Sequence, residues 1–159
     1  MSDGSDAGPA GGTVRTLVVD DSSVTRMMVG RLLEAQDWCR LVGEAADGIE
    51  ALERVPELQP DLILMDVSMP RMNGLRATQV LRERGHVEPR IVIVSFDTIT
   101  AEEAIERGLR ADGVVNKLHL HGELLPLLAT LFPQVQAGRG DRSSDQSRSA
   151  TRGSTGPAG

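Results

Sequence analysis

The sequence predicts an α/β protein with one domain built on a doubly wound, five-stranded parallel sheet. Two observations predict this class: five short apolar runs are continuous rather than alternating, and stretches with helical spacing or helix-capping signals separate them. Composition is a third, because 40% hydrophobic residues suffice for a core although only 2% of residues are aromatic. Parallel neighbours need crossover helices, so the expected order of elements is (βα)5.

The expected strands are rich in Val, Leu and Ile, as in parallel sheets that helices cover on both faces. They lie at residues 17–19, 40–43, 62–65, 91–94 and 114–115. The first helix is predicted after the first strand, where Val24, Met28, Leu32 and Ala35 recur every three or four residues. We expect Met28 and its neighbour Met27 to be packing residues that compensate for the scarce aromatics.

Three further helices have start signals, which are a capping residue with Glu three positions on, or an Asn–Gly pair: Asp47 with Glu50, Thr100 with Glu103, and Asn73 with Gly74. Gly85 is a stop signal for the helix that follows Asn73. A leucine stripe in residues 120–131 predicts the last helix. Pro126 fits that helix if it begins near Gly122, and otherwise kinks it.

Composition also limits the domain and its environment. Residues 1–12 and 134–159 are low in complexity and predict a flexible N-terminal segment and a disordered tail around a domain at 13–133. The net charge of −6 disfavours specific DNA binding. The single cysteine, Cys39, excludes an intramolecular disulfide, and no apolar run is long enough for membrane insertion or a signal peptide. These features predict a cytoplasmic protein.

Polar side chains follow four of the five expected strands. Asp20 and Asp21 come after the first strand, Asp66 after the third and Ser95 after the fourth, while Lys117 follows the fifth. In an open parallel sheet, ligands bind beyond the carboxyl ends of the strands, so these side chains should converge at one edge.

The chemistry of this group points to phosphoryl transfer with a metal ion. Three nearby carboxylates repel one another unless a cation lies among them, and their hard oxygen atoms suit Mg²⁺ or Mn²⁺. A carboxylate can also attack a phosphoryl group, and Lys117 and Ser95 could then stabilise the transferring oxygens. Proximity alone does not assign which carboxylate attacks.

Residues 17–21 (LVVDD), 62–74 (LILMDVSMPRMNG) and 92–95 (VIVS), with the spacing to Lys117, resemble the receiver domain of two-component response regulators. The resemblance covers roughly residues 15–132. It implies the flavodoxin-like fold with strand order 2-1-3-4-5. Matched by position, Asp66 resembles the phospho-acceptor, Lys117 the ammonium that pairs with the phosphoryl group, and Ser95 the switch hydroxyl.

The same resemblance implies a metal site. Asp21 resembles a direct Mg²⁺ ligand, Asp20 a ligand through water, and Ser68 the donor of a backbone carbonyl beside the carboxylate of Asp66. All of these positions hold competent residues, so the resemblance implies an active receiver.

Three positions depart from the commonest pattern of the family. Leu118 stands after Lys117 in place of a cis-proline, so we expect a trans bond or a rearranged loop there. Val114 replaces a switch aromatic on the fifth strand. Phe96 follows Ser95 where small residues are common, and we expect its ring to narrow access to the carboxylate.

These residues predict a phosphoryl-accepting switch that catalyses only its own phosphorylation and dephosphorylation. Its partners would be a histidine kinase or phosphotransfer protein and an unidentified target protein, met through the surface of the fourth helix, fifth strand and fifth helix; a homodimer is an alternative output. Because few residues follow the domain, we expect no further output domain within this chain.

Three alternatives stay open. One is a phosphorylation-independent binding module on the same scaffold, and another is the receiver fragment of a larger DNA-binding regulator or chemotaxis methylesterase. The third, an aspartate-based phosphatase, is disfavoured because Ser68 stands where such enzymes have a second carboxylate.

Overall fold

The computed structural model describes residues 12–135. The predicted segments 1–12 and 134–159 therefore lie outside the described residues, apart from residues 12, 134 and 135. Val135, which the sequence assigns to the tail, is buried against the core. Strands and helices alternate along the chain in this order: β1 (Val14–Val19), α1 (Ser23–Glu34), β2 (Cys39–Ala45), α2 (Gly48–Leu58), β3 (Leu62–Asp66), α3 (Gly74–Glu83), β4 (Arg90–Ser95), α4 (Thr98–Glu106), β5 (Gly113–Asn116), the 3-10 turn η3 (Lys117–His119) and α5 (Leu120–Leu131).

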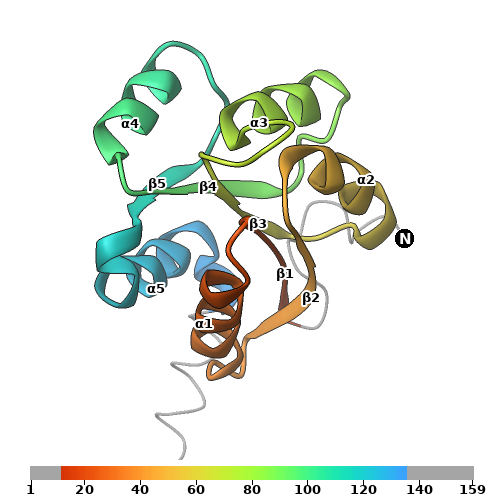
Figure 1. Ribbon diagram of the computed structural model, residues 1–159. Helices are drawn as coiled ribbons and strands as arrows, with labels where there is room; N and C mark the ends of the chain where they lie inside the picture. Colours follow the sequence, from red (N-terminus) through yellow and green to blue (C-terminus); the bar gives the residue numbers. More distant parts are fainter. Residues whose placement is uncertain (1–11, 136–159) are drawn as a thin grey trace, which may run out of the picture.

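The strands form one parallel sheet in the order β2-β1-β3-β4-β5, which confirms the predicted fold. Helices α1 and α5 cover one face, while α2, α3 and α4 cover the other (Figure 1). Leu62 and Leu64 of β3 enter the core beneath α1 and α5, whereas Ile63 and Met65 enter the core on the opposite face. Because both faces are packed, each strand reads as a continuous apolar run.

Two predicted helix starts are confirmed. The carboxylate of Asp47 accepts from the backbone N–H of Glu50 (2.8 Å), and Glu50 in turn accepts from the N–H of Ala46 (2.7 Å). Asn73 accepts from the N–H of Arg76 (2.8 Å) at the start of α3. These side chains satisfy N–H groups that have no partner within the helix.

One other predicted helix start is wrong by three residues. Helix α4 begins at Thr98 rather than after Thr100, because Asp97 provides the cap and accepts from the N–H and hydroxyl of Thr100 (3.1 and 2.6 Å). Helix α5 (Leu120–Leu131) coincides with the predicted leucine stripe, begins two residues before Gly122 and continues through Pro126.

Most of the predicted apolar stripe of α1 is exposed, which corrects the sequence interpretation: Val24, Met28 and Ala35 face solvent, and only Leu32 packs, partly buried, against the core. Val29, Gly30 and Leu33 are the buried residues of α1, whereas Val24 is 66% exposed and Met28 is also exposed. Gly30 allows a close approach on the buried side, since a Cβ there would lie 3.1 Å from the side chain of Leu41. The first turn of α1 therefore presents apolar side chains to solvent, at the edge where β1 ends.

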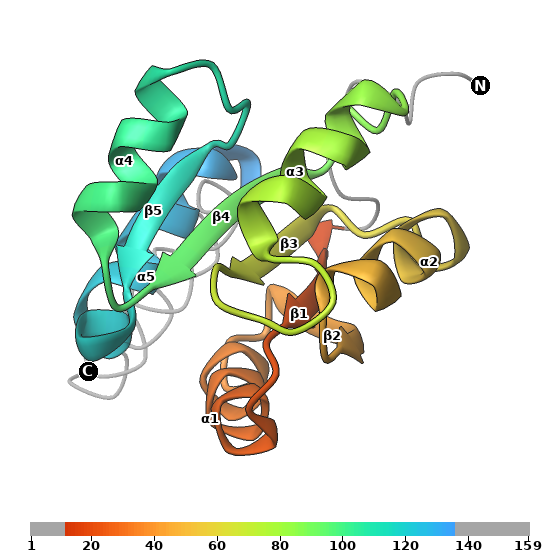
Figure 2. The same cartoon turned by 45° about the horizontal axis from the view of Figure 1, so that its top comes forward.

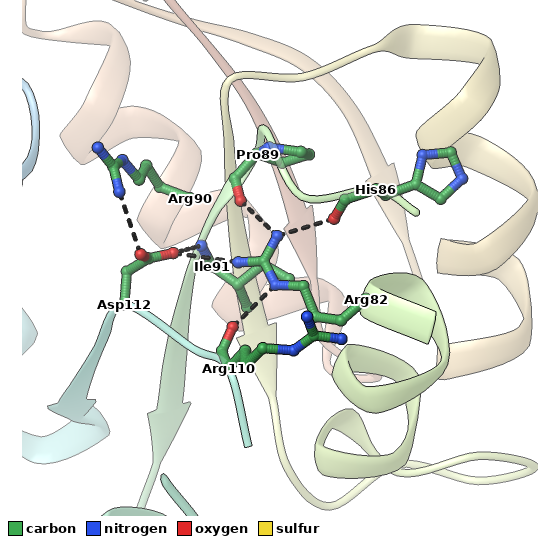
Figure 3. Close-up of polar contacts among 7 residues, drawn as sticks. All are labelled: Arg82, His86, Pro89, Arg90, Ile91, Arg110 and Asp112. Atoms are coloured by element: carbon green, nitrogen blue, oxygen red, sulfur yellow. Dashed lines mark hydrogen bonds and ion pairs between the residues drawn. The ribbon is translucent and has the colours of Figure 1, made fainter. Parts of the chain in front are cut away.

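The opposite, N-terminal edge of the sheet holds a buried arginine (Figure 3). The Arg82 side chain is 6% exposed and extends from the end of α3. Its guanidinium donates to the backbone carbonyls of Arg110 (2.8 Å), His86 (2.8 Å) and Pro89 (2.9 Å) and to the Asp112 carboxylate (3.2 Å). Figure 3 shows the His86 ring turned away from this cluster. Arg82 thus ties the loop before β4 to the loop before β5.

Asp112 completes this edge by accepting from three donors. Besides Arg82, it accepts from the backbone N–H of Ile91 (2.8 Å) and from the guanidinium of Arg90 (3.3 Å). The carboxylate therefore fixes the start of β4 beside the start of β5.

Candidate functional site

The carboxyl ends of four strands bring the predicted side chains together. Asp66 is the last residue of β3 and Ser95 the last of β4, while Asp20 follows β1 and Lys117 follows β5. Figure 2 shows the long loop that leads from β3 to α3 at this edge. The convergence follows from the parallel sheet, because all its strands point toward the same edge.

Lys117 lies between two buried carboxylates. Its Nζ is 2.9 Å from Oδ2 of Asp20 and 3.0 Å from Oδ1 of Asp66. The side chain of Asp66 is only 5% exposed and that of Lys117 9%, so solvent screens these charges weakly.

Asp21 makes this site an acidic cluster. One oxygen from each carboxylate of Asp20, Asp21 and Asp66 lies within 4.8 Å of the others, and Asp21 is the exposed member. Three carboxylates thus share one ammonium, and the cluster carries an excess of negative charge.

The pKa values reflect this excess. Burial raises the pKa of Asp66 above its ordinary value, and the charges of Asp20 and Asp21 raise it further, while the hydrogen bond from Lys117 opposes both effects. Burial acts to lower the pKa of Lys117, but hydrogen bonds with Asp20 and Asp66 outweigh it, so that pKa is raised. The ammonium is therefore charged at neutral pH.

The donor set fits a hard divalent cation. Carboxylate oxygens are the ligands that Mg²⁺ takes in proteins, and it commonly uses one or two of them while keeping several waters. A cation among Asp20, Asp21 and Asp66 would offset the repulsion that raises the pKa of Asp66.

Glycine at position 74 lets the loop after β3 fold back onto its own strand. A Cβ on Gly74 would lie 1.8 Å from the backbone oxygen of Asp66, so any side chain would displace the end of β3. The N–H of Gly74 donates to the carbonyl of Val67 (2.9 Å). The geometry of Asp66 thus depends on Gly74, which the sequence marked only as a helix start.

Two contacts hold the far side of this loop against α2. The Arg71 guanidinium donates to the Asp47 carboxylate (2.9 and 3.2 Å), and the N–H of Gly48 donates to the carbonyl of Met72 (3.0 Å). The hydrogen bond from Arg71 lowers the pKa of Asp47. Sequence reasoning missed this ion pair, because a separation of 24 residues gives no local signal.

Ser95 is buried, and its hydroxyl takes part in the turn into α4. Its Oγ accepts from the backbone N–H of Asp97 (2.9 Å), and Asp97 in turn caps α4. The side chain that the sequence identified as a switch is thus one hydrogen bond away from the cap of α4.

Phe96 lies at the mouth of the site with its ring exposed. The ring centroid is 5.0 Å from Nζ of Lys117, and 66% of the residue is accessible to solvent. The ring therefore contacts the ammonium; whether it also narrows access to Asp66 stays a prediction.

Comparison with known proteins identifies the family. The model of the response regulator receiver domain matches residues 16–128, which is more than half of the chain. The chain belongs to the response regulator receiver family. Receiver domains take phosphoryl groups from histidine kinases and bind Mg²⁺ through an acidic pocket.

Curated relatives of this receiver include protein-glutamate methylesterase/protein-glutamine glutaminases. The enzyme of Thermotoga maritima is 40% identical over 122 residues, which are 77% of this chain and 35% of that protein. An enzyme of Geobacter metallireducens is 46% identical over 101 residues, or 60% of this chain and 28% of that protein. The chain thus spans about a third or less of the length of these relatives.

Solved structures give the same family. The response regulator domain of Thermotoga maritima CheB has 32% identity and a TM-score of 0.65, with 77% of this chain and 96% of that chain covered. A LuxR-family response regulator from Aurantimonas sp. SI85-9A1 has 31% identity and a TM-score of 0.68, with 77% and 86% covered.

The departures from the family pattern can be located in this receiver. The bond before Leu118 is trans, as predicted, and Lys117–His119 form η3, in which the Asn116 side chain accepts from the N–H of Leu118 (2.8 Å). Val114 is partly buried against the core beneath α4. Among residues 12–135, no helix is both long and apolar enough to cross a membrane.

Proposed function

We propose that this receiver accepts one phosphoryl group on Asp66, with Mg²⁺ or Mn²⁺ as cofactor, and acts as a switch on a partner protein. The observation that carries the proposal is the position of Asp66, which is buried at the end of β3 with its Oδ1 3.0 Å from the Lys117 ammonium.

The transfer needs one nucleophilic carboxylate. An oxygen of Asp66 forms a bond to phosphorus, and the bond from phosphorus to the donor breaks, leaving its electron pair on the donor atom: a histidine nitrogen of the kinase, or an oxygen of acetyl phosphate. Water later attacks the same phosphorus, which releases inorganic phosphate and restores the carboxylate.

Lys117 and Ser95 stabilise the charge on the transferred group. The ammonium, which already contacts Asp66, can pair with a phosphoryl oxygen, and the hydroxyl of Ser95 can donate to another. If the Ser95 side chain rotates to reach that oxygen, its Oγ leaves the N–H of Asp97, and the turn before the cap of α4 loses that hydrogen bond. We propose that this links phosphorylation to the surface of α4, β5 and α5.

The metal would be held by the carboxylates of Asp20, Asp21 and Asp66 and by the backbone carbonyl of Ser68. When bound, it supplies positive charge to the phosphoryl oxygens. Asp21 is the exposed member of the group, so it is the carboxylate that solvent reaches first.

The proposed partners are a histidine kinase or phosphotransfer protein as donor and an unidentified protein as target, with homodimerisation as an alternative output. We propose a cytoplasmic location, in keeping with the free thiol of Cys39, and no activity on an external substrate. The short coverage of the methylesterase relatives favours a second candidate, the receiver fragment of a larger regulator.

Labelling tests the proposal. The chain is incubated with acetyl phosphate or phosphoramidate and Mg²⁺, and intact mass with peptide mapping should show one phosphoryl group, on Asp66. Asp66→Asn should abolish the label, while Asp97→Asn, which keeps a capping side chain at the same edge of the sheet, should retain it. A wild-type level of label on Asp66→Asn would overturn the assignment, and no label on the wild type would favour the phosphorylation-independent binding module.

A further inference from the structure

The ring of Phe96 contacts a charged group. Its centroid is 5.0 Å from Nζ of Lys117, within the distance at which an ammonium is attracted to the face of an aromatic ring. At 66% exposure, burial of apolar surface contributes little to holding the ring there. The attraction between the ring and the ammonium is a physical reason for the ring to lie beside Lys117.

The ring contacts an ammonium that has one N–H donor more than the two carboxylates beside it can account for. An ammonium has three N–H donors, and the carboxylates of Asp20 and Asp66 account for two of them. Lys117 is only 9% exposed although it stands at the mouth of the site, where the exposed ring of Phe96 lies against it. The ring therefore lies close to the ammonium without competing for its hydrogen-bonding partners.

This placement matters for phosphoryl transfer. A lysine has a long stem with several rotatable bonds, so holding its ammonium at one point costs rotamer entropy. During transfer the ammonium must exchange a carboxylate contact for a phosphoryl oxygen while staying close to Asp66. A ring beside Nζ disfavours rotamers that carry the ammonium into solvent, because those rotamers lose the contact with the ring.

We propose that Phe96 is a positioning residue that holds the Lys117 ammonium at Asp66 through its aromatic face. The inference rests on the proposed phosphorylation of Asp66 and goes beyond it, because it assigns a role to a position where the family commonly has a small residue.

The test compares side chains that differ in aromatic character but keep their bulk. Phe96→Leu keeps most of the apolar volume and loses the ring, whereas Phe96→Tyr keeps the ring. Leu118→Ala serves as a control that removes another exposed apolar side chain from the same edge. Two quantities are measured on each folded variant: the ring-current shift of the Lys117 side-chain protons by NMR, and the rate of Asp66 labelling by phosphoramidate with Mg²⁺.

We expect Phe96→Leu to lose the ring-current shift and to be labelled about two- to fivefold more slowly, the range given by an exposed cation–π contact. Phe96→Tyr should restore both quantities, and Leu118→Ala should leave both unchanged. Equal labelling rates for the Phe, Leu and Tyr proteins would overturn the inference and leave the proposed function standing. A shift that persists in Phe96→Leu would also overturn it. No label on any protein, the wild type included, would overturn the proposed function and this inference with it.

Discussion

At the C-terminal edge of the sheet Lys117 lies between two buried carboxylates, with the third, Asp21, beside them. At the N-terminal edge Arg82 lies among three backbone carbonyls and one carboxylate, that of Asp112. Both edges bury charge. At the C-terminal edge three carboxylates face one ammonium, so negative charge exceeds positive charge. At the N-terminal edge the guanidinium of Arg82 is balanced by the carboxylate of Asp112, and we call this the matched edge.

The difference separates the proposed site of phosphoryl transfer from a structural one. Burial lowers the pKa of Arg82 and the charge of Asp112 raises it, but a guanidinium stays protonated, so its donors remain engaged. At the other edge, burial and the neighbouring carboxylates raise the pKa of Asp66. Excess negative charge of this kind is relieved by a cation or by a change at Asp66, and both are steps of the proposed chemistry.

The largest effect is expected from breaking the matched edge. Arg82→Met leaves the partly buried carboxylate of Asp112 without its buried partner and removes donors from three carbonyls, so the free energy of unfolding should fall by about 3 kcal/mol. Urea denaturation measures it. Arg90→Met is the matched control, because Arg90 bonds the same carboxylate but its side chain is 51% exposed, and the loss there should be below about 1 kcal/mol. Equal losses would show that burial does not distinguish the two arginines.

Mg²⁺ should stabilise the protein by binding at the C-terminal edge, where negative charge is in excess. A ligand that binds only the folded state at ten times its Kd raises the free energy of unfolding by about 1.4 kcal/mol. Thermal denaturation with and without Mg²⁺ measures this gain. It should shrink in Asp66→Asn and persist in Arg90→Met, whose substitution lies at the other end of the sheet. Superimposable melting curves of the wild type would exclude a cation site in the cluster.

Asp66→Asn should stabilise the metal-free protein by roughly 1 kcal/mol, because it removes repulsion from a buried charge. The gain should depend on pH. The pKa of Asp66 is raised above 3.8, so the folded state binds the carboxyl proton more tightly than the unfolded state. The wild type therefore loses stability as the pH rises from 3.8 to the higher pKa of the folded state. The advantage of Asp66→Asn in EDTA should therefore be largest near pH 7 and decline as pH falls toward 3.8. An advantage that does not change with pH would mean that the charge of Asp66 is not its source.

The side chains at the C-terminal edge could be predicted from the sequence, whereas the contacts at the N-terminal edge could not. Asp20, Asp66 and Lys117 could be predicted because each follows an apolar run, and a parallel sheet brings such positions together. The partners of Arg82 could not, because three of them are carbonyls that every residue carries. A buried arginine among backbone carbonyls leaves no compositional pattern.

Helix orientation was misjudged for a related reason. Val24 and Met28 have helical spacing, but Val29 and Leu33 have it too, and periodicity does not say which of the two stripes meets the sheet. In the structure Val29 and Leu33 are buried, and the close approach of Gly30 to Leu41 lies on the same side of the helix, a contact that exists only in the folded chain. The cap of α4 was displaced likewise, since Asp97 and Thr100 are both acceptable caps and the Ser95 turn favours Asp97.

The smallest expected effect concerns the access of small molecules to Asp66 at the C-terminal edge. No such access is expected to matter at the matched edge, where Arg82 has a structural role. Phe96→Ala and Phe96→Leu both lose the aromatic contact with Lys117, so the difference between them reports the bulk at the mouth of the site alone. If that bulk restricts access to Asp66, the Ala variant should be labelled by phosphoramidate several-fold faster than the Leu variant. Spontaneous loss of the label should accelerate by a similar factor, because the donor and the attacking water use the same opening. A barrier change near 1 kcal/mol corresponds to about a fivefold change in rate.

Equal rates for the two variants would place the side chain of residue 96 away from the path to Asp66. Its role would then be confined to the ammonium.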